Sequence, residues 1–257
     1  KYPEWELTNT RIKQLLIEGV GGVIFFGGSI YELYSKCRTF KKWSQNPLLL
    51  CADVEEGVGQ RFSGASNFIP PMSIAQIYNY DPNKAIKLAE EYGRLTSSQA
   101  IFCGLNFILA PVCDINTNSM NPVINMRAWG EDPKTVSSLT SAFYRGLVSN
   151  KVISCAKHFP GHGDTDIDSH LDLPVLNHDI NRLEEIELLP FRNLISEGIS
   201  TIMTGHLLMN KIDPNYPATL SFEVTTKLLR ERLDFQGLIV TDALIMNSIS
   251  ERYGPEE

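Results

Sequence analysis

Residues 157–170, with the sequence KHFPGHGDTDIDSH, gather most of the side chains that could carry out chemistry. The stretch holds a lysine, three histidines and three aspartates spaced two residues apart. It directly follows the apolar residues 152–156, which are typical of a buried strand. Titratable groups at a strand end and beside glycines are typical of an active-site loop. We therefore expect the rest of the chain to place further functional groups around it.

Asp168 and His170 are the pair in this stretch best suited to proton transfer. Residues two apart in an extended segment point to the same side, so the carboxylate can accept a hydrogen bond from one ring nitrogen. That bond fixes the tautomer and raises the basicity of the ring, which makes His170 a competent general acid and base. A solvated loop with charges of no special role is the simpler alternative.

A metal site is a third interpretation of residues 158–170, because the aspartates resemble the start of a calcium-binding loop. In such a loop, however, glycine would occupy the position of Ser169 and a bidentate glutamate that of Val175. We therefore expect no metal ion and no cofactor.

Asp242 is a second candidate for catalysis, because it ends the apolar residues 238–241. A carboxylate at a strand end that faces a polar pocket can act as the nucleophile of a glycosidase. The alternative is a helix N-cap for the segment that follows, and its position alone leaves both interpretations open.

Asp53 and Arg61 lie at either end of a glycine-containing loop with the sequence DVEEGVGQRF. Asp53 can accept two hydroxyl hydrogens from a sugar. Arg61 either binds an oxygen of the ligand or holds the loop by pairing with Glu55 or Glu56.

Five more polar or aromatic groups have both a functional and a structural interpretation. Lys157 can donate to sugar hydroxyls, and the adjacent His158 either shares that role or orients the loop. Arg127 is a candidate donor to the ligand, with Trp129 beside it as a stacking surface or a core residue. His206, at another strand end, is more typical of a structural histidine than of a catalyst.

Short apolar runs alternate with helical patterns along the chain, which predicts an α/β fold with a parallel sheet. Polar residues such as Asp53, His206 and Asp242 recur at the carboxyl ends of the predicted strands, as in a TIM (β/α)8 barrel. Six of the eight strands of such a barrel can be found, so we expect one barrel domain over residues 1–257 that is incomplete at both ends. The predicted strands are residues 20–26, 48–53, 107–112, 152–156, 201–204 and 238–241.

Composition is that of an ordinary globular protein, with 43% hydrophobic residues and a formal charge of −7 over 257 residues. No basic block suggests a nucleic-acid partner, and no segment is apolar enough to suggest a membrane partner. Five cysteines without a CxxC pair indicate reduced core thiols. With no secretory signal at the start, these features lead us to expect a cytoplasmic protein. The oligomeric state cannot be predicted.

Four motifs resemble glycoside hydrolase family 3, and in particular its bacterial β-N-acetylhexosaminidases of peptidoglycan recycling. In chain order they are DVEEGVGQRF, APVCDINTNSMNPVINMRAWGEDP, KHFPGHGDTDIDSH and GLIVTDALIM. This is also their order in the family, and they extend across almost the whole chain. The glycine order within residues 54–61 departs from the family pattern, while Asp53, Gln60 and Arg61 match it. The resemblance implies a TIM barrel, of which this chain covers the second to the seventh strand.

The resemblance also implies a role for each matching residue. Asp242 matches the nucleophile, and His170 with Asp168 matches an acid/base dyad. Residues that bind N-acetylglucosamine in the −1 subsite match Asp53, Arg61, Arg127, Lys157 and His158.

These roles predict a retaining exo-β-N-acetylglucosaminidase that acts on a carbohydrate, with peptidoglycan fragments as the implied substrate. Asp242 would attack the anomeric carbon while His170 protonates the leaving oxygen. A neutral histidine base does not repel an incoming anion, so a phosphorylase is the alternative enzyme. A catalytically silent sugar-binding barrel is the alternative from another class.

Overall fold

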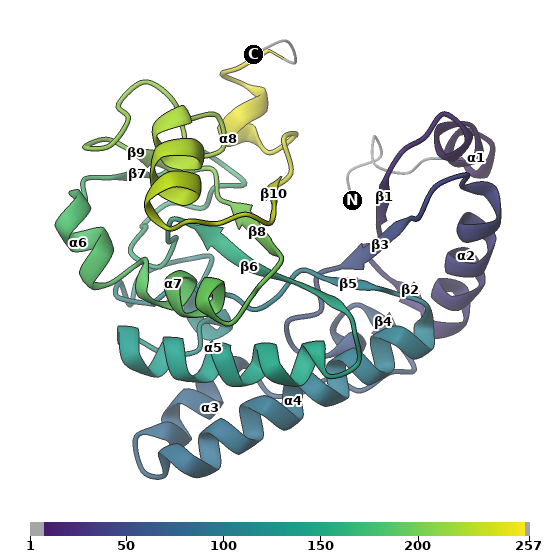
Figure 1. Ribbon diagram of the computed structural model, residues 1–257, viewed down its shortest axis with the longest axis horizontal. Helices are drawn as coiled ribbons and strands as arrows, with labels where there is room; N and C mark the ends of the chain where they lie inside the picture. The colour runs from purple at the N-terminus through teal and green to yellow at the C-terminus, as the bar shows by residue number, and fades with distance from the viewer. Residues whose placement is uncertain (1–7, 255–257) are drawn as a thin grey trace.

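The computed structural model describes residues 8–254. Within them, the main sheet contains six parallel strands whose order in space follows their order in the chain. Figure 1 shows this sheet curving from its first strand to its last, so the predicted TIM-barrel class and the six-strand count are confirmed. The strands are β1 (Gly22–Ile24), β3 (Leu49–Ala52), β5 (Phe107–Ile108), β6 (Ile153–Phe159), β8 (Thr201–Thr204) and β10 (Leu238–Thr241).

Most helices begin at the capping residues expected from the sequence. Thr8, Asp81, Asp132 and Asp179 each accept a hydrogen bond from a main-chain N–H of the first turn, and Ser29 forms a complete capping box with Glu32. The helices are α1 (Asn9–Ile17), α2 (Ile30–Trp43), α3 (Pro71–Tyr78), α4 (Pro82–Cys103), α5 (Pro133–Val148), α6 (Ile180–Glu185), α7 (Leu189–Ser196) and α8 (Asn247–Ser250), with the 3₁₀ turns η2 (Val58–Gln60) and η3 (Asn125–Arg127) and the π-helical η4 (Glu223–Arg232).

The helical pattern of Leu183, Ile186 and Leu189 predicts one continuous helix after Asp179, but the structure divides it into α6 and α7, which corrects that prediction. Pro190 lies in the first turn of α7 and has no N–H to bond to the carbonyl of Ile186. The break turns the Glu187 side chain into the protein, where it is buried. Helix α3 was not predicted, because its two-turn length is too short for a clear period.

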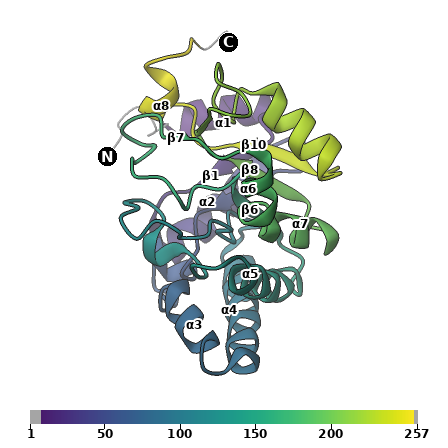
Figure 2. The same cartoon turned by 90° about the vertical axis from the view of Figure 1, so that its left-hand side faces the viewer.

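Helices α4 and α5 pack side by side below the sheet in both views (Figures 1 and 2). The close approach needs glycine at the crossing, since a Cβ on Gly93 would lie 2.1 Å from the Phe143 carbonyl oxygen. Trp129 lies above this crossing with its ring centroid 5.0 Å from that of Phe143. Trp129 is fully buried, so of its two interpretations the core role is the one observed.

Two small parallel ribbons join the loops at the carboxyl ends of the main strands. Strand β2 (Gly28–Ser29) pairs with β4 (Phe62–Ser63), and β7 (Val175–Leu176) pairs with β9 (Leu208–Met209). The loops after β1 and β3, and those after β6 and β8, are thereby held together. Among the described residues, no helix combines the length and the apolar character needed to cross a membrane. All five cysteines are free thiols, and four of them are buried.

Candidate active site

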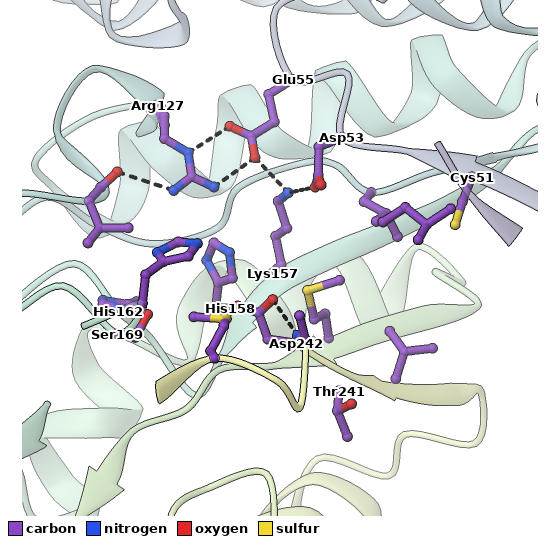
Figure 3. A pocket seen from close by; sticks show the side chains of 18 of the residues that line it. Cys51, Asp53, Glu55, Arg127, Lys157, His158, His162, Ser169, Thr241 and Asp242 are labelled. Carbon is purple, nitrogen blue, oxygen red and sulfur yellow. Dashed lines mark hydrogen bonds and ion pairs between the residues drawn. The ribbon is translucent and has the colours of Figure 1, made fainter. Parts of the chain in front are cut away.

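A cavity of about 850 Å³ opens at the carboxyl ends of the main strands (Figure 3). All eight residues selected from the sequence line it, although they come from segments spread over nearly 190 positions of the chain. This is the arrangement expected at the carboxyl face of a barrel. The lining residues from the sequence analysis are Asp53, Arg61, Arg127, Lys157, His158, Asp168, His170 and Asp242.

Lys157 is the buried centre of an ion-pair network at one side of the cavity. Its Nζ lies 2.6 Å from Asp53 Oδ1 and 2.6 Å from Glu55 Oε1. Burial alone would lower the pKa of Lys157, but the two carboxylates raise it above its usual value. The ammonium is therefore charged. The Asp53 side chain keeps 26% of its surface exposed, so it can still accept a hydroxyl from a ligand.

Glu55 completes this network and was not selected from the sequence. Arg127 donates from Nε and Nη2 to its two oxygens, both at 2.8 Å. Burial works against ionisation of Glu55, but Arg127 and Lys157 hold its pKa well below the usual value. The only sequence signal was its spacing of two residues from Asp53, which puts both carboxylates on one side of an extended segment.

Arg61 takes neither of the two glutamate partners considered from the sequence. Its Nε donates to the main-chain carbonyl of Asp53 over 3.2 Å, and the side chain lines the cavity. This bond closes the loop that begins at Asp53. The arrangement is compatible with the ligand-binding interpretation of Arg61, which stays a prediction.

Asp114 organises the histidines at the end of β6 from a fully buried position. It accepts hydrogen bonds from the N–H of His162 (2.7 Å) and from the N–H and Nδ1 of His158, the latter at 2.7 Å. Because a carboxylate only accepts, Nδ1 of His158 carries the hydrogen. Burial raises the pKa of Asp114, but His158 and His162 together bring it below the usual value. The sequence placed Asp114 at a strand end without a role.

Asp242 faces the cavity from the end of β10. Its Oδ1 accepts from the N–H of Ala243 at 2.7 Å, and α8 begins only at Asn247, so Asp242 is not the N-cap of that helix. Burial works to raise its pKa, but His158, the Ala243 N–H and more distant positive groups lower it below the usual value. Asp242 is therefore a carboxylate at neutral pH, as a nucleophile must be.

His206 supports the Asp242 segment and has the structural role expected of it. Its Nε2 lies 3.0 Å from the carbonyl oxygen of Ala243, and its Nδ1 lies 2.8 Å from Thr219 Oγ1. Burial lowers the pKa of His206, so the ring is neutral. Since a carbonyl only accepts, the hydrogen is on Nε2 and the Thr219 hydroxyl donates to Nδ1.

Asp168 and His170 form the pair predicted from their spacing. Asp168 Oδ1 accepts from the His170 N–H at 2.8 Å and lies 2.7 Å from its Nδ1. Burial raises the pKa of Asp168, but these bonds and the nearby ring bring it below the usual value. The carboxylate fixes the hydrogen on Nδ1, which leaves Nε2 of His170 to exchange a proton with a ligand.

The glycines of this loop have a packing role. A Cβ on Gly163 would lie 1.7 Å from the carbonyl oxygen of Ile115, and one on Gly161 would lie 2.8 Å from Glu187 Cβ. The absence of a side chain lets the loop lie directly on its neighbours. Several histidines and aspartates of residues 158–170 are hydrogen-bonded: Asp164 binds Thr117, His158 binds Asp114, and Asp168 binds His170.

The chain matches the glycosyl hydrolase family 3 N terminal domain over residues 3–257. It belongs to that family. Beta-hexosaminidase A of Pseudoalteromonas piscicida is 35% identical over 92% of this chain and 43% of its own length. A beta-hexosaminidase of Methylobacillus flagellatus is 35% identical over 94% of this chain and 70% of its own length. The chain thus spans less than half of the first relative.

Two solved structures of the family have the same fold. A family 3 β-N-acetylglucosaminidase from a Paenibacillus species superposes with a TM-score of 0.89 and 34% identity, covering 97% of this chain and 48% of the other. Native NagZ from Neisseria gonorrhoeae gives a TM-score of 0.85 and 32% identity, covering 94% of this chain and 71% of the other. The family resemblance drawn from the four motifs is therefore confirmed.

Proposed function

We propose that this chain carries the catalytic barrel of a retaining β-N-acetylglucosaminidase. The observation that supports it most is a single cavity that holds an ionised Asp242 together with the Asp168–His170 pair. A nucleophile and a proton donor are the two groups that retaining glycosidases need. The names of the solved Paenibacillus β-N-acetylglucosaminidase and of the curated beta-hexosaminidases point to the same class of reaction.

In the proposed mechanism Asp242 attacks the anomeric carbon, and His170 gives the proton on Nε2 to the leaving oxygen. The same ring then removes a proton from water, which releases the sugar with its β configuration retained. Asp53, Lys157 and Arg127 hold the sugar hydroxyls, with Arg61 and His158 at the edges of the same subsite. Peptidoglycan fragments are the substrate implied by the family resemblance, and the free thiols agree with a cytoplasmic location.

Hydrolysis of a chromogenic aryl N-acetyl-β-glucosaminide by the full-length protein tests this proposal. We expect steady release of the aryl group, at a rate that falls by a factor of at least about 10³ in Asp242→Ala. The reaction is run with and without inorganic phosphate, and the sugar product is identified. Turnover by Asp242→Ala at the wild-type rate would refute the nucleophile, and N-acetylglucosamine-1-phosphate as the main product would refute hydrolysis.

A further inference from the structure

Ser169 is buried although the residues around it are exposed. Its exposed fraction is 2%, whereas the side chains of Asp168 and His170 on either side are 31% and 50% exposed. Leu171, the next residue, is 71% exposed. A buried hydroxyl in the middle of an exposed loop marks the point at which that loop is attached to the body of the protein.

The attachment is a hydrogen bond to His162, whose Nε2 lies 3.0 Å from Ser169 Oγ. The other ring nitrogen, Nδ1, lies 2.8 Å from Thr165 Oγ1. Burial lowers the pKa of His162 to about 4, so the ring is neutral, with one nitrogen donating and the other accepting. Hydroxyl groups can both donate and accept, so Ser169 and Thr165 satisfy the ring in either tautomer.

His162 is itself fixed to the part of the site that is proposed to hold the sugar. Its N–H donates to Asp114 Oδ1, and Asp114 also binds the ring of His158. Asn121 Nδ2 donates to the His162 carbonyl at 2.8 Å and also contacts Thr165 Oγ1 at 3.2 Å. A chain of short contacts therefore runs from the sugar-binding side through His162 to the residue between Asp168 and His170.

The loop has a second attachment of a different kind. Asp172 pairs with Arg252 over 2.5 Å, but both side chains are about half exposed. Exposed ion pairs contribute little to stability, because water and salt screen them. The buried contact at Ser169 is therefore the better candidate for fixing the position of Asp168 and His170.

We propose that His162 is a positioning residue: its hydrogen bond to Ser169, here called the latch, holds Asp168 and His170 in place. The inference depends on the proposed function, since it assigns His162 a task in delivering the proton of His170. A hydrogen bond between neutral groups has a modest net strength, so its loss should move His170 without unfolding the protein.

Two substrates with different leaving groups test the latch on the full-length protein. The leaving group of a 2,4-dinitrophenyl N-acetyl-β-glucosaminide departs as a stable anion and needs no proton, whereas the alkoxide of an alkyl N-acetyl-β-glucosaminide needs one. We expect His162→Ala and Ser169→Ala to lower kcat/KM for the alkyl substrate by about tenfold or more, as for the loss of one buried hydrogen bond. For the dinitrophenyl substrate we expect a loss of about twofold or less.

Ser169→Thr keeps the hydroxyl and should restore most of the activity on the alkyl substrate. Asp166→Asn changes an exposed residue of the same loop and should leave both substrates unaffected. Equal losses on both substrates, or no loss in Ser169→Ala, would overturn the latch while the hydrolase proposal stands. A wild-type protein that cleaves neither substrate would refute the proposed function itself, and with it the latch.

Discussion

Replacing Glu55 by glutamine tests whether the buried ion-pair network holds the sugar subsite together. The change keeps the size of the side chain but removes one negative charge between the buried Lys157 and the partly exposed Arg127. Asp53 would then be the remaining carboxylate in contact with Lys157. The glutamine would also turn its own NH₂ hydrogens toward one of the two cationic groups.

The size of the effect follows from burial. Removing one partner of a buried ion pair costs about 3–5 kcal/mol when the other charge is left desolvated and unpaired. Lys157 keeps Asp53 as a partner and Arg127 is partly exposed, so we expect a loss at the lower end of this range. For a domain of this size, each kcal/mol shifts Tm by about 2–4 °C, so a loss of 3 kcal/mol lowers Tm by roughly 6–12 °C. Catalysis should suffer as well, since a charged hydrogen bond contributes about 1.5–3 kcal/mol, or roughly 10–100-fold in kcat/KM.

The assay is a thermal melt together with kcat and KM on the aryl substrate, in the full-length protein. Glu56→Gln is the matched control, because burial and the neighbouring Glu55 raise the pKa of Glu56, so that losing this charge should cost no stability. The double variant Glu55→Gln with Arg127→Gln removes both charges and should recover part of the lost stability. If Glu55→Gln has the same Tm and the same kcat/KM as Glu56→Gln, the network does not support the site and the reasoning is wrong.

Two further predictions concern the proton donor and the response to acid. Asp168→Asn should reduce kcat/KM by a factor of about 10² or more on substrates that need a protonated leaving group. The free energy of unfolding should change by no more than about 0.5 kcal/mol, because the Asp168–His170 pair is partly exposed. The lowered pKa of Glu55 means that its contribution to stability is complete above its ordinary value of 4.5 and is lost as the pH falls below it. Denaturant melts between pH 6 and pH 3 should therefore show a smaller acid loss in Glu55→Gln than in the wild type, by up to about 1.4 kcal/mol per pH unit; equal slopes would contradict the pKa assignment.

Features that depend on neighbouring residues could be predicted from the sequence. The caps at Ser29 and Asp132, the strand ends at Asp53 and Asp242, and the Asp168–His170 pair each follow from spacing along the chain. The parallel sheet follows in the same way, since apolar runs and helical patterns alternate. The short apolar runs between the helical patterns were enough to find all six strands of the main sheet.

Features that depend on contacts between distant segments could not be predicted. Glu55 and Arg127 are 72 positions apart, and their bidentate pair has no local signal. The need for glycine at position 163 comes from the backbone of Ile115, which the sequence does not place beside it. For the same reason the sequence indicates no partner for His162, since its bond to Ser169 exists only once the loop has folded back.

The charges in the site divide between two tasks. Asp53 and Glu55 balance Lys157 and Arg127, so this network is neutral as a whole and can receive an uncharged sugar without creating an unpaired charge. Within residues 8–254, Asp242 has no cation in salt-bridge contact. Burial works to raise its pKa, but His158, the Ala243 N–H and more distant groups lower it, so Asp242 is ionised. A carboxylate paired tightly with lysine or arginine would be a poor nucleophile, because attack would have to break that pair. The separation of a paired sugar-binding side from an unpaired carboxylate is therefore what supports Asp242, rather than Asp53 or Glu55, as the attacking group.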